Sequence, residues 1–386
     1  MSFVALRMLI GDRLKYLALV AGLAFAGLLV TQQSSIFTGY ASRMGVWIRE
    51  TAENDLWVMD PQVQYSDDIK PITDTMLYRV RGVEGVRWAA PMYKGFLPAR
   101  LPDGTITTVR VVGLDDATLT GGPARMVEGA LADLRQDRAM IVHVRQAADG
   151  LRLKSGMPGE GPRPLRVGDE VSINDNSLRV TGVFDASDEF FWDPVVYTTY
   201  SRALSIAPRT RKLSTFVLVK TAEGADVKDV ARRIEASTGM RAMTPGQFDR
   251  LTMWFLLTRT GILVNFGITV ALGVVIGVLA SAQTFFSFIV ENTRHFATIK
   301  AMGGSDWTIT RMILLQVLVV GGVGYGIGLG LAAVTGQFFA GGGLAFRMPW
   351  QIPVLGAVSV LGCCMFAGMI SAFRVFRLQP AAVFKA

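Results

Sequence analysis

Residues 291–305 read ENTRHFATIKAMGGS, a charged stretch between two long runs of apolar sequence. Neither the run before it, Thr260–Val290, nor the run after it, Leu314–Phe346, contains a charged residue. Two further uncharged runs are Tyr16–Ser42 and Met348–Phe373. Each run exceeds the ~20 apolar residues that cross a bilayer as a helix. The sequence therefore predicts an α-helical membrane protein with four transmembrane helices.

Residues 43–259, between the first and second runs, have the charge density of a soluble domain, with 29 basic and 28 acidic residues. Segments rich in Val, Thr and aromatic residues predict strands, and two segments with helical periodicity predict helices. We therefore expect a mixed α/β extracytoplasmic domain inserted between transmembrane helices 1 and 2. The predicted strands are Leu56–Asp60, Val86–Arg100, Thr105–Leu114, Arg138–Val144, Glu170–Ile173, Ser177–Phe184 and Ser214–Lys220, and the predicted helices are Ile69–Val80 and Asp226–Ser237.

The basic residues outside this domain predict the topology. The chain carries a net charge of +8, and 10 basic residues face only 3 acidic ones outside residues 43–259. Nine of the ten lie in residues 1–15, in residues 291–311 or in the C-terminal tail; the other is Arg347. The positive-inside rule places those three segments in the cytoplasm and the large domain outside. The basic excess is thus a topology signal and no indication of nucleic-acid binding.

The expected organisation follows from these runs. It comprises a cytoplasmic amphipathic lead (1–15), helix 1 with a stalk (16–42), a periplasmic α/β domain (43–252), a stalk with helix 2 (253–290), a polar cytoplasmic helix (291–311), helix 3 (312–337), a short periplasmic loop (338–352), helix 4 (353–373) and a cytoplasmic tail (374–386). Helical periodicity continues after the first run and is also present just before the second run, so both stalks are predicted to be helical. Trp47, Trp254 and Trp350 are expected near the outer membrane interface.

Glycines in the spans have a spacing typical of packed transmembrane helices. Gly322, Gly326 and Gly330 recur at every fourth residue, as do Gly273 and Gly277. That spacing lets helix backbones approach closely in lipid. A glycine-rich nucleotide site is the alternative interpretation, but no strand precedes the run and no acidic residue follows it about 20 positions on. We therefore predict helix packing.

The sequence contains no recognisable catalytic or metal-binding set. It lacks the G-x-x-x-x-G-K-[ST] loop of nucleotide hydrolases. His143 and His295 are expected on opposite sides of the membrane, and the adjacent Cys363 and Cys364 lie within the last span. The spans have no central charge, which disfavours an ion-driven relay. The chain is therefore predicted to be non-catalytic, with energy supplied by another protein at residues 291–305.

The acidic pairs of the domain are interpreted as solvated surface, because arginines lie near them in the sequence. These pairs are Asp67/Asp68, Asp115/Asp116 and Asp188/Glu189.

Residues 291–305 resemble the E-R-x-R-E-I-G-I-L-R-A-L-G-A-S segment of permeases of the MacB/FtsX/LolC type, which belong to ABC transporters. Residues 377–384, RLQPAAVF, resemble the closing R-L-D-P-A-E-A-L-R of that family, and residues 165–184 resemble its V-G-D … F-x-V-x-G-V-F strands. The sequence FATIKAMG at residues 296–303 most resembles that of the DevC branch, whose members work with a membrane-fusion adaptor of HlyD type. Asn292, His295 and Ala297 depart from the pattern, where the family has Arg, Glu and Gly.

The resemblance implies a multi-pass protein of the bacterial inner membrane with both termini in the cytoplasm. It implies a homodimer, or a dimer with a sister permease, docked on two copies of a separate ABC ATPase that binds the ATP and Mg²⁺. The function expected is mechanotransmission of ATP hydrolysis to export or extraction work in the periplasm, with a HlyD-like adaptor. The alternative is an FtsX-like transmembrane regulator of a periplasmic hydrolase. The residues expected to dock the ATPase, on a coupling helix, are Glu291, Arg294, His295, Lys300 and Gly303.

Overall fold

A computed structural model describes residue 7 and residues 13–51, 53–154, 161–191, 193–208, 213–340 and 344–376. The chain forms two compact units. One is the inserted domain, Ser42–Thr260, and the other combines Met1–Ala41 with Gly261–Ala386. Most of the predicted lead at 1–15, most of the tail at 374–386 and the whole of the motif at 377–384 lie outside the described residues.

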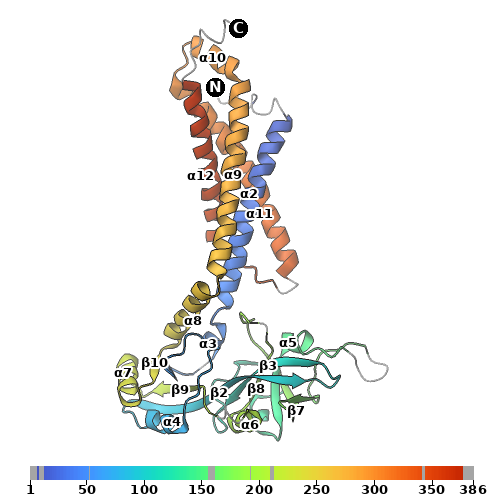
Figure 1. Ribbon diagram of the computed structural model, residues 1–386, viewed down its shortest axis with the longest axis vertical. Helices are drawn as coiled ribbons and strands as arrows, with labels where there is room; N and C mark the ends of the chain where they lie inside the picture. The colour runs from blue at the N-terminus through green and yellow to red at the C-terminus, as the bar shows by residue number, and fades with distance from the viewer. Residues whose placement is uncertain are drawn as a thin grey trace. The chain divides into compact units, whose positions relative to one another are not determined.

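Four long helices dominate the helical unit (Figure 1): α2 (Arg13–Arg43), α9 (Ile262–Glu291), α11 (Asp306–Ala340) and α12 (Gln351–Phe376). Each contains a stretch that is long and apolar enough to cross a membrane. Large apolar side chains such as Ile268, Val334 and Phe338 are exposed on these helices. Exposed apolar side chains are stable in lipid, and a helix satisfies its own backbone polar groups there. The predicted four transmembrane helices are thus confirmed.

Glycines bring α11 close to α2. A Cβ atom added to Gly324 would lie 2.7 Å from the Cβ of Leu23, and one added to Gly328 would lie 2.8 Å from the backbone N of Leu28. Gly273 and Gly277 of α9 likewise approach Leu29 and Ala26 of α2. The glycines of α11 that pack against α2, Gly324 and Gly328, are therefore not the ones that the four-residue spacing predicted. A Cβ at Gly322, Gly326 or Gly330 would meet no atom within 4 Å among the described residues.

The two sets of glycines on α11 give a matched test. Gly328→Ala places a methyl group against the backbone of α2, so it should destabilise the helical unit by about 1–3 kcal/mol, the usual cost of overpacking. Gly326→Ala, two residues away, has open space within the chain, so in the monomeric chain it should be neutral or stabilising, because alanine favours the helix. Thermal unfolding of both variants in detergent measures the difference; equal melting temperatures would contradict the packing described here.

Ten strands of the inserted domain are joined through the long strand β2. The strands are β1 (Leu56–Met59), β2 (Val86–Arg100), β3 (Ile106–Leu114), β4 (Arg125–Glu128), β5 (Ala139–His143), β6 (Glu170–Ile173), β7 (Asn176–Asp185), β8 (Val195–Thr199), β9 (Phe216–Thr221) and β10 (Arg241–Met243), paired in the order β10-β1-β9-β2-β3-β8-β5-β7-β4. The first half of β2 pairs with β9 and the second half with β3. All seven predicted strands are confirmed, and β4, β8 and β10 were missed.

Six of these strands close on themselves, because β6 pairs with both β2 and β7. The ring of pairings runs β2-β3-β8-β5-β7-β6 and back to β2. Alternate residues of each strand point inward, as in a small barrel. Side chains such as Leu97, Val109, Val111 and Met140 fill the interior and are fully or almost fully buried. The intervening residues of β2 and β3, including Lys94 and Arg110, therefore lie on the other face of the ring.

Helices cover the remaining faces. On the β10-β1-β9-β2 sheet, α4 (Asp74–Arg81) and α7 (Val227–Thr238) bury Leu77, Val230 and Ile234. The shorter helices are α3 (Val46–Glu50), α5 (Val144–Ala148), α6 (Tyr200–Ile206) and the 3-10 helix η1 (Leu131–Arg135). The predicted helix at 69–80 begins only at Asp74, because Ile72 forms an isolated β-bridge with Ser214.

Both predicted stalks are interrupted helices. On the first, α2 ends at Arg43 and Gly45 adopts a φ of 65°, so the chain turns before α3. On the second, Gly261, with a φ of 71°, separates α8 (Pro245–Arg259) from α9. Trp47 of α3 is buried in the domain core with Trp57 and Phe216, so its predicted place at the membrane interface is wrong. Trp254 and Trp350 are exposed.

Candidate functional site

The charged segment 291–305 folds as a short helix between two spans. The second span, α9, ends at Glu291, and α10 (Thr293–Ala301) follows after the single residue Asn292. Gly303 has a φ of 91°, a conformation that favours glycine, and it turns the chain toward α11. Two backbone bonds close the turn, from Gly303 N to Lys300 O and from Gly304 N to Ile299 O. These bonds end α10 and turn the chain into the next span.

Helix α10 has one buried and one exposed face. Phe296, Ala297 and Ile299 are buried. Phe296 belongs to the same apolar cluster as Leu19 of α2 and Ile309 of α11. The exposed face carries Arg294, His295, Thr298 and Ala301, and it continues into Met302, the residue that follows the helix. Met302 is 73% exposed, and the nearby Trp307 of α11 is 72% exposed. The segment therefore presents a mixed basic and apolar surface on a firmly packed base.

The five residues predicted to dock an ATPase differ in position. Glu291, Arg294 and His295 are exposed. Lys300 is directed to Asp306, and its Nζ lies 2.9 Å from Asp306 Oδ1. Gly303 forms the turn that ends α10. The predicted docking set omits Met302 and Trp307, although both are large apolar residues beside charged ones, which is a recognisable signal of a contact surface.

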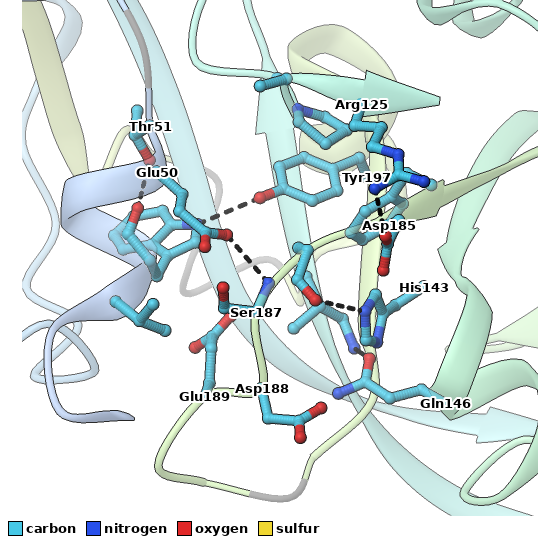
Figure 2. Close-up of a pocket in the computed structure, with 18 of the residues that line it drawn as sticks. Glu50, Thr51, Arg125, His143, Gln146, Asp185, Ser187, Asp188, Glu189 and Tyr197 are labelled. Atoms are coloured by element: carbon cyan, nitrogen blue, oxygen red, sulfur yellow. Dashed lines mark hydrogen bonds and ion pairs between the residues drawn. The ribbon is translucent and has the colours of Figure 1, made fainter. Parts of the chain in front are cut away.

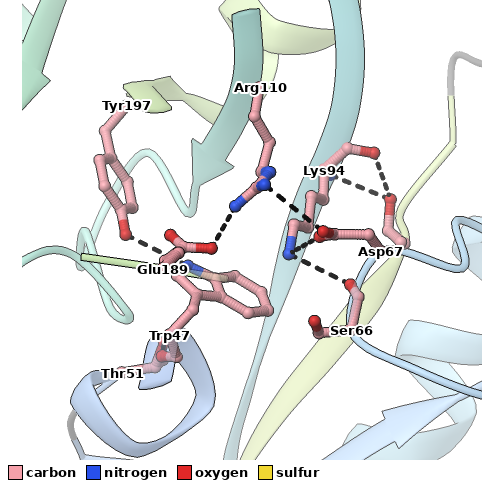
Figure 3. A network of polar contacts seen from close by, with 9 residues as sticks. Trp47, Thr51, Ser66, Asp67, Lys94, Arg110, Glu189 and Tyr197 are labelled. Atoms are coloured by element: carbon pink, nitrogen blue, oxygen red, sulfur yellow. Dashed lines mark hydrogen bonds and ion pairs between the residues drawn. The ribbon is translucent and has the colours of Figure 1, made fainter. Parts of the chain in front are cut away.

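The inserted domain contains a buried ionic cluster that joins segments far apart in the chain (Figure 3). The side chains of Lys94 on β2 and Arg110 on β3 have no exposed surface. Lys94 Nζ lies 2.5 Å from Asp67 Oδ1, and Arg110 Nη2 lies 3.4 Å from Asp67 Oδ2. Arg110 also forms an ion pair with Glu189. Two cations are therefore matched by two carboxylates, as a buried site requires.

Trp47 covers this cluster. Lys94 Nζ lies 3.6 Å from the centre of its indole ring, a cation–π contact. The indole Nε1–H donates to the hydroxyl of Tyr197 at 3.2 Å. Burial raises the pKa of the Tyr197 phenol, so that hydroxyl stays neutral. The expectation that Asp67 and Glu189 are solvated surface residues is wrong: Asp67 is 5% exposed and Glu189 17%, because both pair with side chains that have no exposed surface.

A cleft of about 570 Å³ opens in the domain beside the cluster. Figure 2 shows Glu50, Ser187 and Glu189 on one side of it and His143, Gln146 and Asp185 on the other. The cleft is lined from α3, the segment 121–125, β5, α5, the end of β7, the loop at 186–189 and β8. His143 Nε2 lies 3.0 Å from the carbonyl oxygen of Ala186, so this ring helps to hold the loop. No local sequence pattern predicts this cleft, since its walls come from five stretches that are far apart in the sequence.

Two protein families match the chain. Residues 17–237 match the MacB-like periplasmic core domain, and residues 267–380 match the FtsX-like permease C-terminal domain. No curated protein matches the chain.

Solved structures of other proteins are similar to the chain over about half of its length. The extracellular domain of the noncanonic ABC-type transporter YknZ from Gram-positive bacteria is 16% identical, with 50% of this chain and 99% of that chain covered and a TM-score of 0.34. The periplasmic region of MacB from Actinobacillus actinomycetemcomitans is 14% identical, with 53% and 94% covered and a TM-score of 0.38. A domain of a putative permease protein from Porphyromonas gingivalis is 10% identical, with 49% and 87% covered and a TM-score of 0.33.

Four apolar helices with an α/β domain inserted after the first define a class of membrane protein with a large extracytoplasmic domain. Within that class, the chain belongs to the MacB/FtsX/LolC family of ABC-transporter permeases. This family membership implies an ATPase partner and a membrane setting, as the resemblance of residues 291–305 predicted.

Proposed function

We propose that this permease couples ATP hydrolysis by a separate cytoplasmic ABC ATPase to export or extraction work outside the membrane, by mechanotransmission. The observation that carries the proposal is the form of α10. Its exposed face offers Arg294, His295 and Met302 to a partner, while Phe296 on the opposite face is buried among side chains of two spans. A push on α10 would therefore reach the spans through packed contacts.

The remaining parts of the assembly follow from this proposal. The ATPase binds as two copies and holds the ATP and Mg²⁺, and a second permease copy completes the transporter. The open face of α11 at Gly322, Gly326 and Gly330 supports a second copy, because small residues allow close helix contact in lipid. A HlyD-like adaptor and the DevC branch stay predictions. So does placement in the inner membrane with both termini inside.

The test of the proposal is reconstitution of the full chain with the ABC ATPase subunit produced beside it in the cell. We expect the two to co-purify and the ATP turnover of the ATPase to change by several-fold when the permease is present in a lipid nanodisc. A permease that neither retains the ATPase nor alters its turnover would contradict the proposal.

The topology is tested separately by thiol labelling in intact cells. Ser305→Cys, beside α10, should be protected from a membrane-impermeant maleimide until the cells are opened. Ala236→Cys, on the exposed surface of α7, should react in cells whose outer barrier alone is permeable. Labelling of both thiols from the same side would contradict the orientation. The native Cys363 and Cys364 are half-buried or buried within α12, and the unaltered chain gives their background.

A further inference from the structure

We propose that the cleft of the inserted domain (Figure 2) binds an amphipathic organic cation, whose ammonium group pairs with Glu50. The cleft lies entirely within the inserted domain, so a test of ligand binding there does not depend on whether an ATPase docks at α10.

The size and lining of the cleft suit a small molecule. Its volume of about 570 Å³ lies within the range of roughly 300–1,000 Å³ that is usual for ligand pockets. Val46, Phe184, Val195 and Tyr197 form an apolar part of the lining. Such pockets combine an apolar surface with a few polar groups that fix the orientation of the ligand. The polar groups here are mostly charged.

The charges of the lining leave one carboxylate without a counter-ion. Six of the seven Asp, Glu and Arg residues that line the cleft have ion-pair partners among the described residues, and Glu50 is the exception. The pairs are Arg49–Asp249, Arg125–Asp185, Arg145–Asp188 and Glu189–Arg110. Glu50 instead accepts one hydrogen bond, from the backbone N–H of Ser187 at 3.1 Å. A carboxylate accepts about four such bonds, so Glu50 retains sites for a ligand ammonium group.

The distribution of the paired charges also favours a cation. The side chains of Arg125 and Arg145 are 76% and 68% exposed, so their charges lie out in the solvent. Their partners Asp185 and Asp188 are 31% and 29% exposed. In these two pairs the carboxylate is less exposed than its guanidinium partner, and the lining as a whole carries four carboxylates against three guanidinium groups, which favours a negative potential in the cleft. Low-dielectric walls such as Phe184 and Val195 strengthen that potential.

Glu50 belongs to α3, the first helix of the domain after the first span. A cation bound there would contact the segment through which α2 continues into the domain. Its binding energy would therefore act on α3.

The electrostatic part of the proposal is tested on the full chain with two methanethiosulfonate reagents, one carrying a trimethylammonium group and the other a sulfonate group. Ser187→Cys places a thiol in the cleft, and Ala236→Cys places one on α7, outside its lining. We expect the ratio of cation to anion reaction rates to be about tenfold higher at the cleft thiol, the effect of a potential of one to two kT on opposite charges. Glu50→Gln should bring this ratio close to that of the α7 thiol.

The matched control is Glu223→Gln, the same substitution at a side chain that is 89% exposed and outside the cleft. It should leave the ratio at Ser187→Cys unchanged. The α7 thiol in the Glu50→Gln background reports whether the domain is still folded, because its rates should stay the same. Equal ratios at the two thiols, or a ratio insensitive to Glu50→Gln, would overturn the proposal.

The ligand class is tested by protection against iodoacetamide, a neutral reagent. 4-Phenylbutylamine should slow alkylation of the thiol of Ser187→Cys at least threefold at a concentration where 4-phenylbutyrate, its anionic counterpart, has no effect. Glu50→Gln should remove the difference between the two compounds. Equal protection by both compounds, or better protection by the anion, would refute a cation site.

Discussion

Replacing Asp67 by asparagine should lower the free energy of unfolding of the inserted domain by about 3–5 kcal/mol, the usual cost of removing one partner of a buried ion pair. Lys94 would then lose its carboxylate partner in a fully buried site, and Arg110 would keep only Glu189. Urea unfolding of the full chain in detergent, followed by tryptophan fluorescence, measures the change, since Trp47 and Trp57 are buried next to the cluster.

The neighbouring residue supplies a matched control. Asp68 forms an ion pair with Lys70 at 3.6 Å, and both side chains are partly exposed. Asp68→Asn should therefore cost less than about 1 kcal/mol, as surface ion pairs do. Lys94→Met in the Asp67→Asn background should restore part of the loss, because it removes the unpaired charge. Similar losses for Asp67→Asn and Asp68→Asn would contradict the buried cluster.

The same cluster predicts a pH dependence of stability. Burial alone would raise the pKa of the Asp67 carboxyl, but Lys94 and Arg110 outweigh it and hold that pKa below its usual 3.8. A carboxyl with a lowered pKa stabilises the fold above its unfolded pKa, and this stabilisation is lost as the pH falls through its folded value. The difference between the wild type and Asp67→Asn should therefore be constant from pH 7 to pH 5 and shrink only below about pH 4.

The spans and most strands could be predicted from the sequence, because local patterns of charge and composition determine them. Uncharged runs identified the four spans because a transmembrane helix makes its backbone hydrogen bonds within itself. Its only further requirements are sufficient length and apolar side chains. Strands such as Val86–Arg100 were found from their composition. Strand β8, Val195–Thr199, was missed, although its residues favour strands, because it is short and follows an irregular loop.

The buried cluster and the cleft could not be predicted, because their residues meet only in the folded chain. Lys94 and Arg110 occupy the strand positions that alternate with the barrel interior, where a charged residue normally indicates solvent. Only the placement of α3 and the loops over that face buries them. Trp47 was assigned to the membrane interface for the same reason. The sequence shows that it lies close to the end of the first span, but it does not show that its ring packs against Trp57 in the folded domain.

For the segment 291–305 the sequence predicts a docking site, and the structure distinguishes the positions of the residues in it. Lys300 and Gly303 stood in the same motif as Arg294, yet Lys300 pairs with Asp306 and Gly303 forms a turn. Charge reversal at Lys300 would thus disturb the turn as well as any partner. Arg294 and Met302 are better probes, since both lie on the exposed face of α10.

Arg294→Glu combined with Met302→Asp should lower permease-dependent ATP turnover at least tenfold while the protein is still expressed and inserted. Truncating a residue at the centre of an interface typically costs about 2 kcal/mol or more, and each 1.4 kcal/mol is a factor of ten in affinity. The measurement is ATP turnover of the reconstituted complex together with retention of the ATPase on the tagged permease.

Arg311→Glu is the matched control, because it reverses a basic charge in the same connection between the second and third spans, at an exposed position on α11 rather than on α10. It should leave turnover within about twofold, the small effect that is usual for a charge at the rim of an interface. If Arg311→Glu were as damaging as the double variant, a general electrostatic attraction would explain docking and α10 would have no special role. If neither variant altered turnover, the ATPase would act at another part of the chain, whereas the cleft at Glu50 would be unaffected by either result.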